Sequence, residues 1–196
     1  HLQAYRSLRL EKQQEPLRND IYLLGMAHYK AGEYAAAIDR LKEVKEMADS
    51  ISESAYLHLG HSYLRVEDEE KAKLSYAAAM QLNINSKVRE EAMYNYVQIT
   101  YLQGSATGES ITAFKQFLTE YPNTKYANKI YALMADMYLT SKNYQAAYKA
   151  LSEIQNPDTK MQDTKQYLRY QLGMDAFLQG KLQDAIEWMT QVIDHA

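Results

Sequence analysis

A short pattern of residues recurs five times in this chain of 196 residues, and it constrains the fold more than any other feature. The clearest copy consists of Tyr56, Leu59, Gly60, Tyr63, Ala72 and Tyr76. The position of Gly60 recurs at Gly25, Gly60, Gln98, Ala135 and Gly173, in steps of 35, 38, 37 and 38 residues. A period of about 20 to 50 residues indicates an array of small structural units that stack on one another.

Each copy predicts two short amphipathic helices. In the second copy, apolar residues lie three and four positions apart, which places them on one face of a helix. Gly60 and Ala72 are small enough to let the two helix backbones approach closely. Gly32 and Gly180 fall where the first helix of a pair must end and turn. The composition agrees, because only 7 Gly and 3 Pro occur. Most of the 18 Tyr fall at interior positions of the repeat.

The pattern resembles the tetratricopeptide repeat (TPR) family, whose unit of about 34 residues has this order of aromatic, Leu, Gly and Ala positions. The resemblance extends from Arg18 to the C-terminus. It implies an all-α, right-handed α-α superhelix, a single solenoid over 1–196. The expected units are a helix within 1–16 and helix pairs at 18–51, 53–86, 91–127, 128–163 and 166–196. Because no closing helix follows the fifth pair, we expect a fragment of a longer array.

The third copy departs from the pattern. Its two small positions, Gln98 and Ala113, are 15 residues apart, against 12 in the other copies. The three extra residues lie within Gly104–Gly108, which predicts an extended turn. This turn is either a tolerated insertion or a lip that contacts a partner. Gln98 is also larger than Gly, so we expect this helix pair to be the loosest.

The end of the third copy points to a bacterial subclass. Tyr121-Pro122, followed by Thr124 and Ala127, resembles repeats of the outer-membrane assembly lipoproteins and of the Tol–Pal accessory factor. This likeness covers about one repeat. It implies a periplasmic or envelope-associated protein, in preference to a cytoplasmic one.

Sequence motifs typical of catalysis are missing. The chain has no Cys, no glycine-rich phosphate loop and no nucleophile elbow. His58 and His61 have the spacing of two metal ligands, but no motif supplies a third. The net charge of −3, with both signs interspersed, gives no reason to expect nucleic acid. No run of about 18 apolar residues occurs. We therefore expect no enzyme activity, no cofactor, no metal and no membrane-spanning segment.

The resemblance also implies a binding surface, because the family forms a concave face from the first helix of each unit. Family members that bind a chaperone's C-terminal carboxylate use Lys, Asn and Arg there. Tyr22 and Met26 stand where Lys and Asn would be, so this carboxylate clamp is not expected. The groove residues that the repeat frame predicts, with Arg65 on the same face, are Asn19, Tyr22, Met26, Tyr29, Leu57, His58, His61, Asn95, Tyr96, Ile99, Asp136, Tyr170 and Met174.

Aromatic and Met side chains at these positions suit a helix or an extended segment of another protein. The leading hypothesis is therefore a protein–protein interaction scaffold without catalysis. The alternative is a ligand-sensing or dimerising repeat portion of a bacterial signalling protein, such as a sensor kinase or a regulator. The sequence does not decide between them, because a fold does not fix a function.

Overall fold

The computed structural model describes residue 4 and residues 17–103 and 108–194, all of which are helix or connecting turn. Most of the helix expected within 1–16 and of the Gly104–Gly108 insertion lies outside the described residues. The chain divides into two compact units, His1–Ser105 and Ala106–Ala196, which we describe separately. Among the described residues, no helix combines the length and the apolar character needed to cross a membrane.

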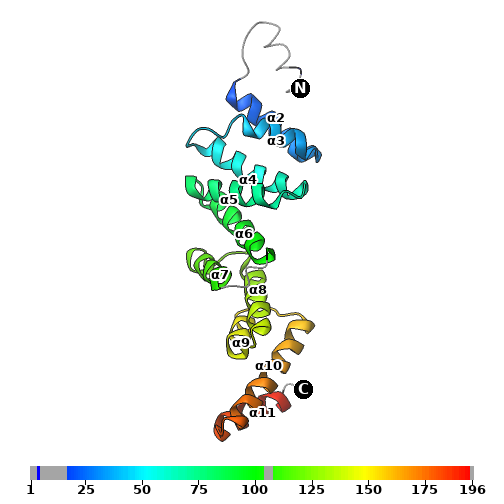
Figure 1. Cartoon of the computed structure of the whole chain (residues 1–196), viewed down its shortest axis with the longest axis vertical. Helices are drawn as coiled ribbons and strands as arrows, with labels where there is room; N and C mark the ends of the chain where they lie inside the picture. Colours follow the sequence, from blue (N-terminus) through cyan, green and yellow to red (C-terminus); the bar gives the residue numbers. More distant parts are fainter. Residues whose placement is uncertain (1–3, 5–16, 104–107, 195–196) are drawn as a thin grey trace. The chain divides into compact units, whose positions relative to one another are not determined.

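Over residues 17–103, unit 1 contains two helix pairs and a further helix (Figure 1). The pairs are α2 (Arg18–Ala31) with α3 (Tyr34–Lys42) and α4 (Ser50–Arg65) with α5 (Glu69–Leu82), and the further helix is α6 (Ser86–Leu102). Helix α4 is central, because it contacts all four of the others. Helices α2, α4 and α6 are the first helices of the predicted repeats, and they pack side by side.

Unit 2 contains α7 (Gly108–Glu120), α8 (Ala127–Thr140), α9 (Tyr144–Ser152), α10 (Thr159–Leu178) and α11 (Leu182–Asp194). Each of these helices contacts the next one along the chain. The boundary between the units falls within the predicted third repeat, whose first helix α6 belongs to unit 1 and whose second helix α7 belongs to unit 2.

Short polar side chains start several helices. The Asp49 carboxylate accepts the backbone N–H of Ser52 at 2.9 Å, so α4 begins three residues before the expected repeat boundary at residue 53. The Asp158 carboxylate accepts the N–H of Met161 at 2.8 Å, and α10 begins at Thr159 instead of residue 166. The α2–α3 and α10–α11 turns have left-handed glycines, Gly32 (φ 79°) and Gly180 (φ 73°), as the sequence predicted.

The core of unit 1 consists of the predicted repeat positions. Ala37, Leu41, Ala72 and Tyr76 are fully buried between helices. The small-residue positions bring backbones together, because a Cβ on Gly25 would lie 2.9 Å from Leu41 Cδ2. The fold class predicted from the spacing is therefore confirmed at the level of packing.

A buried carboxylate fixes the start of α6 to α4. The Glu53 side chain is 0% exposed, and its Oε1 accepts the backbone N–H of Ile84 at 2.7 Å. Its two carboxylate oxygens also accept the N–H of Asn85, at 3.1 and 3.0 Å. These bonds satisfy the backbone N–H groups of Ile84 and Asn85, which lie in the turn before α6 and have no acceptor within a helix. Glu53 thus helps to position the third helix of the predicted binding face.

Candidate functional site

In unit 1 the predicted groove residues come from three adjacent helices, α2, α4 and α6, which we call the first-helix face. Tyr22, Met26, Tyr29 and Tyr96 are half-buried and pack against the core. The Tyr22 hydroxyl lies 2.7 Å from Ser54 Oγ, within hydrogen-bond distance. Of the remaining predicted residues of unit 1, Asn19 is exposed, while His58, His61 and Asn95 are half-buried.

Two predicted groove residues lie in the core instead of on this face. The exposed fraction of Leu57 is 4% and that of Ile99 is 3%. Both belong to the hydrophobic core of unit 1. Leu57 lies on α4 and Ile99 on α6, and each of these helices packs against two or more neighbouring helices of unit 1, so positions that would face solvent on an isolated helix pair are covered here. We therefore leave Leu57 and Ile99 out of the surface that a partner could contact.

A cluster of one tyrosine and two histidines occupies the middle of the first-helix face. The rings of Tyr29 and His58 meet edge to face, with centroids 5.0 Å apart, and the ring centroids of His58 and His61 are 5.8 Å apart. The Tyr29 hydroxyl lies 3.4 Å from His61 Nδ1. His58 Nδ1 lies 2.8 Å from the backbone oxygen of Ser54. Because a carbonyl oxygen only accepts, the Nδ1 of His58 must carry the proton.

Burial keeps both imidazoles neutral near neutral pH. It lowers the pKa of His61 to about 4, and it lowers the pKa of His58 in the same direction. Burial also raises the pKa of Tyr29. The Glu91 carboxylate is 3.6 Å from His61 Nε2. Within the described parts of the chain, no three His, Cys, Asp or Glu side chains gather as a metal site would require.

A pocket of about 390 Å³ opens on the first-helix face beside this cluster. Its lining residues are Tyr29, His61, Leu64, Arg65 and Asn95. The structure thus brings three of the predicted groove residues, Tyr29, His61 and Asn95, together with Arg65 around one pocket. Leu64 was missed, although it occupies the same repeat position as Tyr29, four residues after the small position.

Unit 2 holds the other three predicted residues. Asp136 on α8 is exposed, as is Tyr170 on α10, while Met174 on α10 is half-buried. Met174 lines an entirely apolar pocket of about 470 Å³ between α10 and α11. The other residues lining this pocket are Phe177, Leu182, Ala185, Ile186 and Met189.

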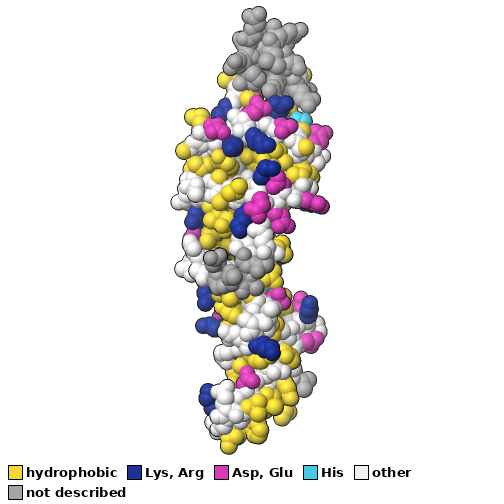
Figure 2. All heavy atoms as spheres, in the orientation of Figure 1, with side chains coloured by type: hydrophobic (Ala, Val, Ile, Leu, Met, Phe, Trp, Pro, Cys, Tyr) yellow, Lys and Arg dark blue, Asp and Glu magenta, His cyan; other side chains and the backbone are white. Residues whose placement is uncertain are grey.

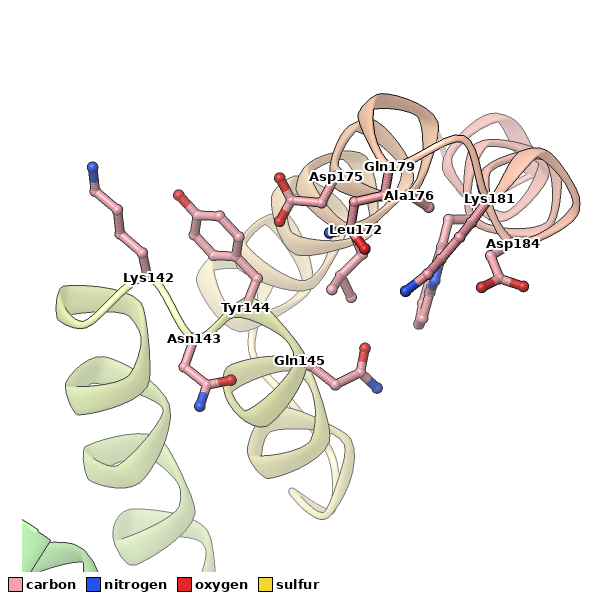
Figure 3. Close-up of a pocket in the computed structure, with 11 residues that line it drawn as sticks. Lys142, Asn143, Tyr144, Gln145, Leu172, Asp175, Ala176, Gln179, Lys181 and Asp184 are labelled. Atoms are coloured by element: carbon pink, nitrogen blue, oxygen red, sulfur yellow. The ribbon is translucent and has the colours of Figure 1, made fainter.

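A second pocket of unit 2, of about 360 Å³, is polar and contains no predicted residue (Figure 3). It lies between the start of α9, the end of α10 and the first turns of α11. Figure 3 shows Gln145 and Lys181 extending toward each other across it, while Lys142 points away. The chain's one Trp, Trp188, also lines it and packs edge-on against Tyr148, with centroids 5.0 Å apart. Several of its residues lie in turns, where the repeat frame assigns no facing direction.

No protein-family model matches the chain, and no curated protein sequence matches it. Solved structures, by contrast, do match the chain. Two structures of a kinesin light chain-like protein from Podosopora anserina, one of them a variant, consist of nearly identical TPR-like repeats. Both share 13% sequence identity with this chain over 90% of its length and 93% of theirs, with TM-scores of 0.50 and 0.49. At this identity the first likeness shows the fold, which is the all-α TPR-like repeat fold predicted from the spacing.

Proposed function

We propose that this protein is a scaffold that binds a helix or an extended segment of another protein on the first-helix face of unit 1. TPR-like folds generally serve protein interaction. The observation that carries the proposal is the pocket lined by Tyr29, His61, Leu64, Arg65 and Asn95, where three adjacent helices contribute side chains. It combines an aromatic ring, a guanidinium group and an amide, which are the groups that anchor peptide segments.

The face has the properties of a binding surface more than of a catalytic one. Its two histidines have lowered pKa values and are packed against one another and Tyr29, which makes them poor proton acceptors at neutral pH. No catalysis is part of the proposal. The envelope-associated location stays a prediction that follows from the resemblance of one repeat.

The test is a comparison of three bait proteins in an affinity capture with quantitative mass spectrometry, from the source cell's soluble and membrane extracts. The groove variant carries Arg65→Glu and Asn95→Lys, which reverse one charge at the pocket and add another. The matched control carries Lys160→Glu and Asn123→Lys, which make the same charge changes at exposed positions of unit 2. Circular dichroism confirms that all three are folded.

We expect a partner that the native chain and the control retain and that the groove variant loses. Equal retention by all three baits would place binding elsewhere on the molecule. Capture of nothing by any of them would contradict a scaffold function in these extracts.

A further inference from the structure

One interior position of the repeat holds a large ring in every copy except the last. It lies three residues after the small position, and in the five copies it is occupied by His28, Tyr63, Tyr101, Tyr138 and Ala176. In the second copy the Tyr63 ring fills the space between α3 and α5. It is 7% exposed, and its centroid lies 5.7 Å from the Nζ atoms of both Lys42 and Lys71. Ala176 on α10 leaves the equivalent space, between α9 and α11, without a ring.

That space is the polar pocket of unit 2, which Ala176 lines. It stays open although Trp188 stands where the second copy has the smaller Ser75, since the indole ring packs against Tyr148. Its volume of about 360 Å³ exceeds the roughly 150 Å³ of a cavity that holds benzene. Leu172 and Ala176 are buried apolar side chains in its lining, and Tyr144 and Trp188 add two aromatic rings. The pocket therefore has room for one aromatic ring with a polar substituent.

The rest of the lining carries charges of both signs, on Asp175, Asp184, Lys142 and Lys181. In the part of the chain that the structure describes, none of these four forms an ion pair. The second copy has opposite charges at the positions of Lys181 and Asp184, and there Asp68 and Lys71 pair with each other at 2.5 Å.

The Lys181 side chain instead extends across the pocket (Figure 3). Figure 2 shows both acidic and basic side chains on the surface of the α10–α11 end of the chain. Charges of both signs that have no partner in the protein are available to a ligand that carries both signs itself.

We propose that this pocket binds a free aromatic amino acid. The ring takes the place that the Tyr63 ring has in the second copy, beside Trp188. The ammonium group pairs with the carboxylates of Asp175 and Asp184, and the carboxylate group pairs with Lys181. An aromatic residue within a protein chain has neither of these charged groups, so the lining favours the free amino acid. The site lies wholly in unit 2, and the proposal does not rest on the first-helix face.

The first test uses the fluorescence of Trp188, which lines the pocket and is the chain's one Trp. L-phenylalanine is the probe, because it does not absorb where Trp is excited. A ligand of this size is expected to bind with a Kd of about 1 mM or lower, so the titration extends to about 20 mM. We expect a saturable change in the emission.

Two further probes separate the ring from the charges. L-leucine has the same charged groups without the ring, and benzyl alcohol has the ring without the charges. Each is expected to bind at least about tenfold more weakly than L-phenylalanine. No saturable change with L-phenylalanine, or equal affinity for L-leucine, would overturn the proposal.

The second test changes the pocket. Ala176→Tyr restores the ring that the other copies have, and it is expected to abolish binding because it fills the space. Circular dichroism verifies that this variant is folded. Persistent binding by the folded variant would contradict the proposed position of the ring.

A pair of charge variants keeps the shape of the pocket. Asp175→Asn with Asp184→Asn removes both acids of the lining and is expected to weaken the binding of L-phenylalanine about threefold to tenfold. The matched control is Asp163→Asn with Glu187→Gln, which removes two exposed acids of unit 2 outside the pocket and should leave the affinity unchanged. Equal affinities of these two double variants would exclude recognition of the ammonium group and overturn the proposal.

Discussion

Gly60 lies against the ring of Tyr76, so closely that a Cβ at this position would be 2.5 Å from Cε1 and 2.7 Å from Cδ1 and Cζ of the ring. Unbonded carbon atoms do not approach to this distance. The contact joins α4 to α5 in the centre of unit 1, where Tyr76 is 0% exposed. The stability of this helix pair therefore depends on the absence of a side chain at residue 60.

Gly60→Ala is expected to destabilise unit 1. Two effects oppose each other, because Ala favours a helix over Gly by about 1 kcal/mol, whereas forcing a methyl group into a filled core costs about 1–3 kcal/mol. Because the clash involves several atoms of a fully buried ring, we expect the steric cost to exceed the gain, with a net loss of up to about 2 kcal/mol. Urea unfolding followed by circular dichroism measures it. A more stable variant would show that the ring moves aside easily.

A double-mutant cycle tests the cause. In the fourth repeat, Ala135 and Leu151 occupy the positions of Gly60 and Tyr76, and both are buried. Tyr76→Leu should therefore make room for the methyl group of Gly60→Ala. We expect the double variant to be more stable than the sum of the single effects predicts, by about 1 kcal/mol or more. Strict additivity would mean that Gly60 and Tyr76 do not interact sterically.

The hydroxyl group of Tyr76 supplies a second prediction. It is buried and has no hydrogen-bond partner among the residues that the structure describes, and burial strongly raises its pKa. An unsatisfied buried hydroxyl costs about 1–3 kcal/mol, while removing it leaves the packing of the ring unchanged. We expect Tyr76→Phe to stabilise unit 1, by about 1 kcal/mol, in the same urea experiment. Tyr56→Phe, at a half-buried site, is the control and should be close to neutral. Destabilisation by Tyr76→Phe would indicate a buried water at this hydroxyl.

The sequence predicted the fold well because the repeat fixes which residues face each other within a pair. Gly60 and Tyr76 belong to the recurring pattern, and so do their counterparts Gly25 and Leu41. Contacts between pairs were less predictable. Leu57 and Ile99 are buried in the core of unit 1, and their burial depends on how adjacent helix pairs stack. That arrangement comes from many weak contacts and leaves no local pattern.

Helix starts were also predicted imprecisely, although the sequence held the necessary signal. Asp158 directly precedes α10, and Asp is a common residue at the N-cap of a helix. Asp49 precedes α4 in the same way. The role of Glu53 had no such signal. A buried carboxylate that binds a turn about 30 residues away is visible only in three dimensions.

Replacement of Glu53 should loosen the first-helix face. In Glu53→Ala the N–H groups of Ile84 and Asn85 lose their acceptor, and a cavity forms at a fully buried site. We expect a loss of about 3–4 kcal/mol, with Glu53→Gln intermediate because its amide keeps one acceptor oxygen. Amide hydrogen exchange should show the largest loss of protection at the start of α6. Equal effects of the Ala and Gln variants would show that shape matters more than hydrogen bonding.

The stability of unit 1 should depend on the protonation of His61. Its pKa is about 4 in the folded chain, because of burial, and about 6.5 in the unfolded chain. Between pH 4 and pH 6.5 the unfolded state binds more protons than the folded state. The contribution of neutral His61 to the free energy of unfolding is therefore complete above pH 6.5 and is lost as the pH falls toward 4. The difference amounts to about 3 kcal/mol. The Glu91 carboxylate, 3.6 Å away, is too exposed to compensate for the burial of the imidazole.

His61→Asn isolates this contribution from that of every other titrating group. The variant loses packing at all pH values, but it has no imidazole to protonate at position 61. The free energy of unfolding, measured in urea at pH 7 and at pH 4.5, should fall less for the variant than for the native chain, by about 2–3 kcal/mol. His58 is present in both proteins and cancels to first order. An identical fall in both would mean that His61 gains a solvated or ion-paired position on protonation, with Glu91 as the partner closest to its Nε2.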